Sequence, residues 1–294
     1  MGGGHHACAC VLDDAIPQTL KFRVLRTLVC FQENVMSYVS DCLTARPLST
    51  YSTEGRIGLI VPPTNTVNEA EWARLMPEGV TSHSFRMKLH PDAGAPDRAA
   101  ELEKDLLASI DMLLPMKPDV VAYACTAGSM VTPSSDLPQK ISETCGTQVV
   151  TTADSIVQAL RALGAAKVTA VTPYDDLRNA HEVSFLRDHG IETLSISGFG
   201  LGKNGPSDFP KIAQLSTADI LVRAREVIHA ESEAIVLTCT DFPTLPLIEE
   251  LETAFGIPVL SSNTATLWGC LRHTPWSGSI AGAGRLLRDM PGRL

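Results

Sequence analysis

From Gly55 onward, the chain alternates between two patterns of apolar and polar positions. Short apolar runs rich in β-branched residues, such as 56–61, predict buried strands, and longer runs with a helical period, such as 99–114, predict amphipathic helices. The predicted strands are 56–61, 80–87, 119–125, 148–151, 167–174, 192–197, 234–239 and 258–262. The predicted helices are 69–76, 99–114, 138–145, 154–163, 177–189, 217–230, 245–255 and a last one that begins at 263. This alternation predicts an α/β protein with parallel sheets.

The order of elements repeats along the chain, which predicts two similar α/β units that face each other across a cleft. We expect a first domain at 55–165 and a second at 166–262, with a C-terminal helix at 263–294 that packs back on the first. The glycine-rich stretch 198–206 is predicted to be a flexible loop between a strand and the next helix.

Residues 1–54 lack this alternation, and we interpret them as a leader that is disordered or partly helical. His5, His6, Cys8 and Cys10 offer soft-metal ligands within a glycine-rich stretch. No strand or helix is predicted there to orient them, so a disordered tail is favoured over a metal site.

Composition and charge narrow the classes of function. The net charge of −9 and the absence of a dense Lys/Arg tract argue against nucleic acid as a partner. No apolar run reaches the ~18 residues that span a bilayer, so we expect no membrane segment. Eight scattered cysteines in 294 residues favour a reducing, cytoplasmic setting over a disulfide scaffold. No G-x-G-x-x-G opens a helix after the first strand and no GxxxxGK[ST] occurs, which disfavours dinucleotide cofactors.

Two strands end on the same Cys-Thr pair, at Cys125 and at Cys239. Open α/β sheets bind ligands at the carboxyl ends of their strands. A following turn would point backbone N–H groups at each sulfur, and we expect this field to lower the thiol pKa. A single cysteine in an apolar strand is most simply a core residue, but two at equivalent strand ends favour a nucleophile or base. The other six cysteines lack this context.

Neutral donors near these strand ends suit a small carboxylate or dicarboxylate. The side chains of Asn65, Thr126, Tyr174 and Asn263 can hydrogen-bond carboxylate oxygens, with backbone N–H groups adding to them. Taken one at a time, the asparagines are equally well explained as helix caps and Tyr174 as a turn aromatic after proline.

The chain from Gly55 to about Cys270 resembles the aspartate/glutamate racemase superfamily, and within it the branch of maleate cis-trans isomerases and arylmalonate decarboxylases. The matching segments are Pro62-Pro-Thr-Asn65-Thr, Ala122-Tyr-Ala-Cys125-Thr, Thr172-Pro-Tyr174, Leu237-Thr-Cys239-Thr and Ser261-Ser-Asn263. The resemblance implies two Rossmann-like halves related by a pseudo-twofold axis, with the active site in the cleft between them. It also implies no cofactor and no metal.

In the maleate isomerases that the chain resembles, the first cysteine adds to the alkene and the second handles protons, whereas the decarboxylases keep only the second. This chain has both, which favours the isomerase. The hydroxyl-bearing turn Thr126-Ala-Gly-Ser129 departs from those isomerases and looks more like the oxyanion loop of decarboxylases or of isomerase-like proteins of ectoine breakdown. The expected catalytic residues are Cys125 and Cys239, and the expected substrate-binding residues are Asn65, Thr126, Tyr174, Asn204, Thr240 and Asn263.

Three other functions stay open at this point. The same two thiols would serve an amino acid or hydantoin racemase as an acid/base pair. The turn after Cys125 is also consistent with an arylmalonate decarboxylase-like enzyme. A non-catalytic carboxylate-binding protein is the least favoured. We also expect a homo-oligomer, either a dimer or a tetramer.

Overall fold

The computed structural model describes residues 49–90, 96–130 and 137–292. The chain divides into two units, 1–50 and 51–294, and the second contains every helix and strand of the described residues. The predicted leader and its His5, His6, Cys8 and Cys10 therefore lie almost wholly outside the described residues.

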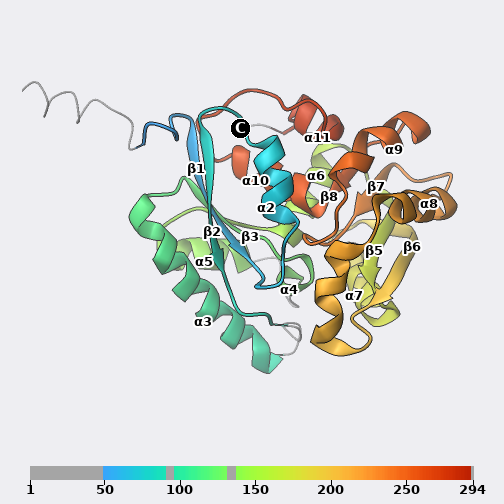
Figure 1. Cartoon of the computed structure of the whole chain (residues 1–294), viewed down its shortest axis with the longest axis horizontal. Helices are drawn as coiled ribbons and strands as arrows, with labels where there is room; N and C mark the ends of the chain where they lie inside the picture. The colour runs from blue at the N-terminus through green and yellow to red at the C-terminus, as the bar shows by residue number, and fades with distance from the viewer. Residues whose placement is uncertain (1–48, 91–95, 131–136, 293–294) are drawn as a thin grey trace, which may run out of the picture. The chain divides into compact units, whose positions relative to one another are not determined.

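The first half of the unit holds a four-stranded parallel sheet in the order β2-β1-β3-β4 (Figure 1). Its strands are β1 (Gly55–Val61), β2 (Val80–Arg86), β3 (Val120–Tyr123) and β4 (Val149–Thr151). All four residues of β3 are buried, which explains why this strand is a continuous apolar run rather than an alternating one.

The second half repeats this topology in the order β6-β5-β7-β8, again with all strands parallel. Its strands are β5 (Lys167–Tyr174), β6 (Glu192–Leu201), β7 (Ala234–Leu237) and β8 (Val259–Ser261). The predicted α/β fold of two equivalent parallel-sheet halves is confirmed, with every predicted strand present.

Helices connect the strands, as the parallel sheets require. The first half contains α2 (Asn68–Leu75), α3 (Pro96–Leu113), the 3₁₀ turn η1 (Leu114–Met116), α4 (Thr126–Ser129), α5 (Leu137–Cys145) and α6 (Thr152–Ala162). The second half contains α7 (Asp176–Asp188), η2 (Gly205–Gln214), α8 (Thr217–Val227), η3 (Leu245–Leu247), α9 (Ile248–Phe255), α10 (Ser262–Leu271) and α11 (Gly284–Asp289). No helix within the described ranges has the length and apolar character needed to cross a membrane.

Helices α6 and α10 pack against each other between the halves. Each begins directly after the last strand of its sheet, with Thr151 capping α6 and Ser261 forming a capping box at α10. Every residue of α10 is buried. The segment 263–294, predicted as one helix, holds α10 and the separate α11, and α11 packs on α9 and β8 of the second half. The proposed domain boundaries remain a prediction.

The predicted flexible loop at 198–206 is wrong in its first half, because β6 continues to Leu201. Gly198 lies so close to β5 that a Cβ there would collide with the carbonyl oxygen of Tyr174. This glycine therefore allows a close strand pairing rather than marking a loop. The rest of the stretch leads into η2.

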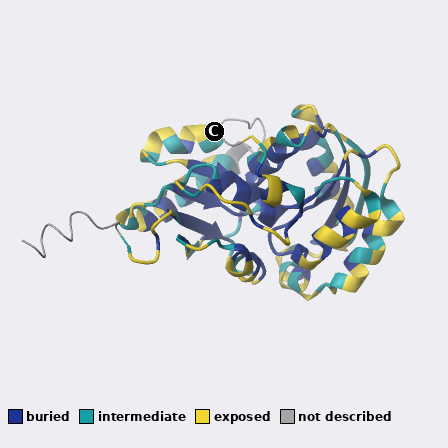
Figure 2. Cartoon of the chain, turned by 90° about the horizontal axis from the view of Figure 1, so that it is seen from above, coloured by how far each residue is buried: buried dark blue, intermediate teal, exposed yellow. Residues whose placement is uncertain are grey.

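The larger of the two hydrophobic cores runs through both halves, and it includes Trp72 of α2, Val150 of β4, Leu237 of β7 and Trp268 of α10. The smaller core lies in the first half and includes residues of α3 and α5. Figure 2 shows the buried residues gathered in the sheets and the helices between them. Because one core is shared, the two strand ends that carry the cysteines are held in a fixed relation.

Candidate active site

Cys125 lies two residues beyond β3 and immediately before α4, with an extended backbone (φ −143°) and a half-buried side chain. Its Sγ accepts hydrogen bonds from the Tyr123 hydroxyl and from the backbone N–H of Gly128. A Cβ at residue 128 would collide with the Tyr123 hydroxyl and lie 2.9 Å from Cys125 Sγ, so only glycine fits there. Burial raises the pKa of the Cys125 thiol, and these two hydrogen bonds oppose that rise.

Cys239 follows β7, but its backbone is strained, with φ at +125°. Such a conformation is costly for a residue with a side chain and is concentrated at functional sites. Its Sγ accepts a hydrogen bond from the Tyr174 hydroxyl and from the Asp241 N–H at 3.4 Å. Burial first, and then the charge of Asp241, raise the pKa of the Cys239 thiol to about 12.

The expectation that both thiols have a lowered pKa is therefore wrong. The N–H groups that follow each cysteine do act in the expected direction, but burial outweighs them. Helix α4 has only four residues, and a turn rather than a helix follows Cys239, so the local field is weak. Both thiols are therefore protonated at neutral pH.

Both cysteines line one cavity of about 70 Å³ between the carboxyl ends of the two sheets. Of the predicted binding residues, the cavity is also lined by Asn65, Thr126, Tyr174 and Thr240. Tyr174 is buried, and burial raises its pKa well above the usual value, so its hydroxyl keeps its proton.

Three of these side chains make hydrogen bonds that cross between the two halves. Thr240 Oγ1 donates to the Ala124 carbonyl (3.1 Å) and accepts from Asn65 Nδ2 (3.0 Å). Thr126 Oγ1 and Ser262 Oγ hydrogen-bond at 2.8 Å, and Ser262 Oγ accepts the Cys239 N–H at 2.9 Å. These bonds fix the position of the cysteine loops relative to each other.

Asn263 does not line the cavity. Its Nδ2 donates to Glu71 Oε2 (2.7 Å) and to the Thr240 carbonyl (3.2 Å), and its Oδ1 accepts from Asn68 Nδ2 (2.6 Å). Glu71 also accepts the N–H groups of residues 244 and 245, so this buried network joins α2, α10 and the loop before η3. Asn263 therefore holds together the elements around the cavity and does not face a ligand in it.

Asn204 does not line the cavity either. It precedes η2, where its backbone N–H (3.0 Å) and its Nδ2 (3.1 Å) both donate to Asp208 Oδ2. This closes the turn after β6.

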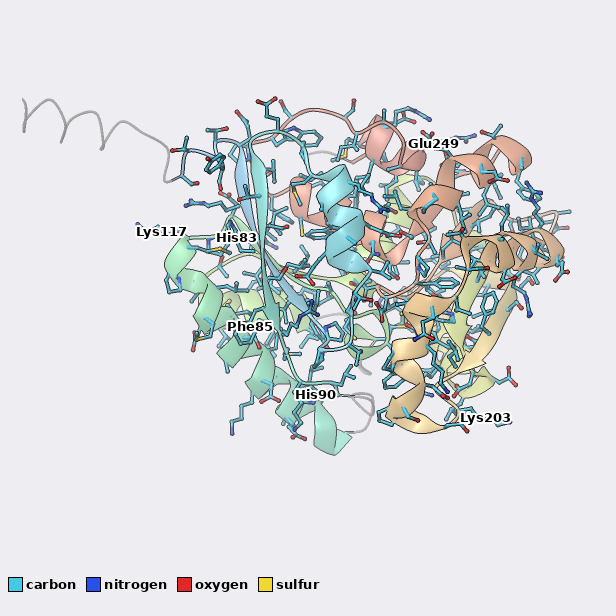
Figure 3. All side chains as sticks on the ribbon, viewed as in Figure 1. His83, Phe85, His90, Lys117, Lys203 and Glu249 are labelled. Carbon is cyan, nitrogen blue, oxygen red and sulfur yellow. The ribbon has the colours of Figure 1, made fainter. Side chains whose placement is uncertain are left out.

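Three charged or titratable residues line the cavity that were not predicted: His90, Arg178 and Asp241. His90 lies beyond the end of β2, at the lower end of the first half in Figure 3, and bonds Asp105 Oδ2 through Nε2 at 3.0 Å. Arg178 Nη1 donates to Asp175 Oδ2 (2.7 Å) and lies over the ring of Phe209. Phe209, Ile212 and Leu89 form an apolar wall.

Behind Cys239 lies a buried carboxyl group, Glu182 of α7, whose Oε2 accepts from Thr238 Oγ1 at 3.1 Å. Its Oε1 has no hydrogen-bond partner among the described residues. Burial raises the pKa of Glu182 to about 7. No cluster of three or more His, Cys, Asp or Glu side chains in the described ranges is arranged to hold a metal ion.

A duplicated parallel α/β fold with one thiol from each half on a shared cavity defines a class of two-cysteine enzymes that act on small molecules. Residues 119–287, more than half of the chain, match the family model described as arylmalonate decarboxylase. The chain is 30% identical over 247 residues to maleate isomerase of Nocardia farcinica. This match covers 80% of this chain and 96% of that one. The chain belongs to this family of arylmalonate decarboxylases and maleate isomerases.

Two further relatives are informative. The chain is 27% identical over 249 residues to arylmalonate decarboxylase of Bordetella bronchiseptica, a match covering 81% of this chain and 95% of that one. It also matches the structure of a cysteine-to-serine mutant of Nocardia farcinica maleate cis-trans isomerase with a covalently bound succinylcysteine intermediate. That match has a TM-score of 0.69 and 30% identity, and it covers 80% of this chain and 98% of the other.

Proposed function

We propose that the protein is a cofactor-independent cysteine isomerase that converts a small cis-enedioate of the maleate type to its trans isomer. The observation that carries this proposal is the pair of sulfur atoms on one cavity, Cys125 half-buried and Cys239 buried with a pKa of about 12. One thiol is accessible to attack a substrate, and the other is held as a proton donor. The succinylcysteine intermediate of the Nocardia farcinica relative supports the same chemistry.

In the first step, Cys125 loses its proton to solvent, its thiolate adds to C2 of the enedioate, and the electron pair of the double bond moves onto C3 and its carboxylate. The Tyr123 hydroxyl and the Gly128 N–H stabilise the thiolate before attack. The Tyr174 hydroxyl and the backbone N–H groups of the cysteine loops then stabilise the developing negative charge by hydrogen bonds.

In the second step, Cys239 gives its proton to C3, which leaves a succinyl group on Cys125 and a thiolate at Cys239. Rotation about the C2–C3 single bond brings the two carboxylates to opposite sides. Cys239 takes the proton back from C3, the C–S bond breaks, and the trans product leaves. No atom is gained or lost over the cycle, which fits the absence of a cofactor from the proposal.

We further propose a cytoplasmic location and a homo-oligomeric state, with no nucleic-acid partner. The four described cysteines, at positions 125, 145, 239 and 270, are free thiols, which supports a reducing compartment.

Proton NMR of the purified protein in D₂O with maleate, aspartate, phenylmalonate and a hydantoin in separate samples tests the reaction class. The proposal expects loss of the maleate alkene signal and growth of the fumarate signal. α-Deuteration of aspartate or the hydantoin without alkene isomerisation would point to a racemase. Formation of phenylacetate would point to a decarboxylase.

A further inference from the structure

The cavity carries an acidic side chain that a site for a dianion would not be expected to have. Asp241 lines the cavity together with both cysteines, and only 6% of it is exposed. The cation in the lining, Arg178, is already bonded to Asp175. An ionised Asp241 would therefore repel a substrate with two carboxylates at short range.

The two oxygen atoms of Asp241 are in different positions. Oδ1 accepts the backbone N–H of Thr66 at 2.8 Å and of Val67 at 3.2 Å, where the chain enters α2. Oδ2 accepts a hydrogen bond from none of the described residues. Because Oδ1 is engaged with two donors, a proton on this carboxyl group belongs on Oδ2, which is the oxygen available to a ligand in the cavity.

We propose that Asp241 is a specificity-determining residue that takes up one proton on Oδ2 when a dicarboxylate binds and then donates it in a hydrogen bond to a substrate carboxylate. This inference rests on the substrate class of the proposed function. A neutral carboxyl group becomes a charge-assisted donor in this way, whereas the ionised form repels the ligand.

The groups around Asp241 are consistent with this role. Burial raises its pKa to about 6, against the opposing effects of the two N–H groups and of Arg86 on β2. Roughly a tenth of the free protein is then protonated at Asp241 at pH 7, and an arriving carboxylate raises that fraction further. The group is thus close enough to neutrality for a substrate to complete its protonation.

The other titratable groups on the cavity differ from Asp241 in how readily they take up a proton at neutral pH. Cys125, Cys239 and Tyr174 already hold their protons at neutral pH, because burial raises each pKa. Arg178 is charged throughout. Among the described cavity residues, the one remaining titratable side chain is His90, which bonds Asp105.

Isothermal titration calorimetry with succinate, a saturated dicarboxylate that cannot react, tests the inference in buffers of different ionisation enthalpy. At pH 7 the wild-type protein is expected to take up close to one proton per succinate bound. Its affinity for succinate should fall about tenfold per pH unit above pH 6.5. Asp241→Asn keeps the shape of the side chain and supplies a permanent donor, so it should bind succinate with no proton uptake and a flat pH profile.

His90→Gln is the matched control and should keep the proton uptake of the wild type. Absence of uptake in the wild type, equal uptake in Asp241→Asn, loss of uptake in His90→Gln alone, or failure of the wild type to bind succinate at pH 6 would each overturn the inference. The wild-type measurement stands by itself if a variant does not fold. Maleate turnover without proton uptake on succinate binding would contradict the role of Asp241 and leave the proposed function intact. Proton uptake without maleate turnover would support the role of Asp241 and contradict the proposed function.

Discussion

The loops at Cys125 and Cys239 carry the same Cys-Thr pair at equivalent strand ends, yet they hold their sulfur atoms differently. Cys125 has an ordinary extended backbone and a half-buried thiol. Cys239 has a strained backbone and a buried thiol whose pKa burial raises to about 12. The repeated fold supplies two thiols on one cavity, and the local differences separate an accessible nucleophile from a firmly protonated partner.

The tyrosines that bond the two sulfurs also come from non-equivalent places. Tyr123 lies on β3, the strand that leads to Cys125, whereas Tyr174 ends β5, the neighbour of the strand that leads to Cys239. At the end of β1, the counterpart of β5, the chain has Pro62 and Pro63 instead of a tyrosine. The two halves therefore reach a similar sulfur environment by different routes, and each can be altered separately.

The largest effect is expected from removing the nucleophile. Cys125→Ala leaves no sulfur to add to the alkene, so maleate isomerisation should fall to the uncatalysed rate in an NMR assay. Folding should be retained, because the side chain is half-buried and small. Residual catalysis well above the rate without enzyme would mean that Cys125 is not the attacking group.

Removing one hydroxyl on the Cys239 side should have the next largest effect. Tyr174→Phe keeps the ring and deletes one donor, so kcat is expected to fall by ~10²–10³, as in oxyanion-hole deletions. Tyr123→Phe is the matched change on the other side, and it should move iodoacetamide alkylation of Cys125 to higher pH. A kcat for Tyr174→Phe within about threefold of wild type would make Tyr174 a packing residue.

Gly128→Ala tests the Cys125 side by geometry alone. The added methyl group displaces the Tyr123 hydroxyl and the Cys125 sulfur, and a displacement of about 1 Å can cost ~10² in rate. We expect a loss of that order in kcat/KM with an unchanged circular dichroism spectrum. Normal activity would show that the Tyr123–Cys125 hydrogen bond does not position the nucleophile.

The smallest effect on activity is expected at Glu182, a buried carboxyl group that bonds Thr238 and does not line the cavity. Its pKa is raised from 4.5 to about 7, so the stability linked to its proton is fully present below pH 4.5 and is lost as the pH rises through 7. The shift corresponds to about 3 kcal/mol. Glu182→Gln should remove this dependence, which urea unfolding of both proteins at pH 5 and pH 8 measures. Parallel pH curves would show that Glu182 is not shifted.

The sequence predicted the strands, and the place of the two cysteines beside strand ends, because both follow from local patterns. Apolar β-branched runs such as 56–61 define buried strands, and Cys125 and Cys239 lie two residues beyond the ends of two of them. The proximity of these residues then follows from the duplicated parallel topology. Proline before Tyr174 likewise placed that residue at the end of a strand.

What the sequence did not predict depends on packing. His90 carries no local signal, and Arg178 reaches the cavity from the first turn of α7, which begins at Asp176 shortly after β5 ends. Asp241 was adjacent to the Cys-Thr pair and could have been included on that ground. The amide of Asn263 is held by the buried Glu71, a contact 192 residues away along the chain. The direction of the thiol pKa shifts was not predicted, because burial depends on tertiary packing.

Mass spectrometry of the Cys239→Ser protein after incubation with maleate tests the central assignment most directly. Serine keeps only a weak hydroxyl at the proton-handling position, so elimination should be slowed and a succinyl adduct should accumulate on Cys125. In the reciprocal Cys125→Ser protein no adduct should form. An adduct confined to Cys239 in that second protein would reverse the two roles, and full activity in both variants would remove the thiols from the mechanism.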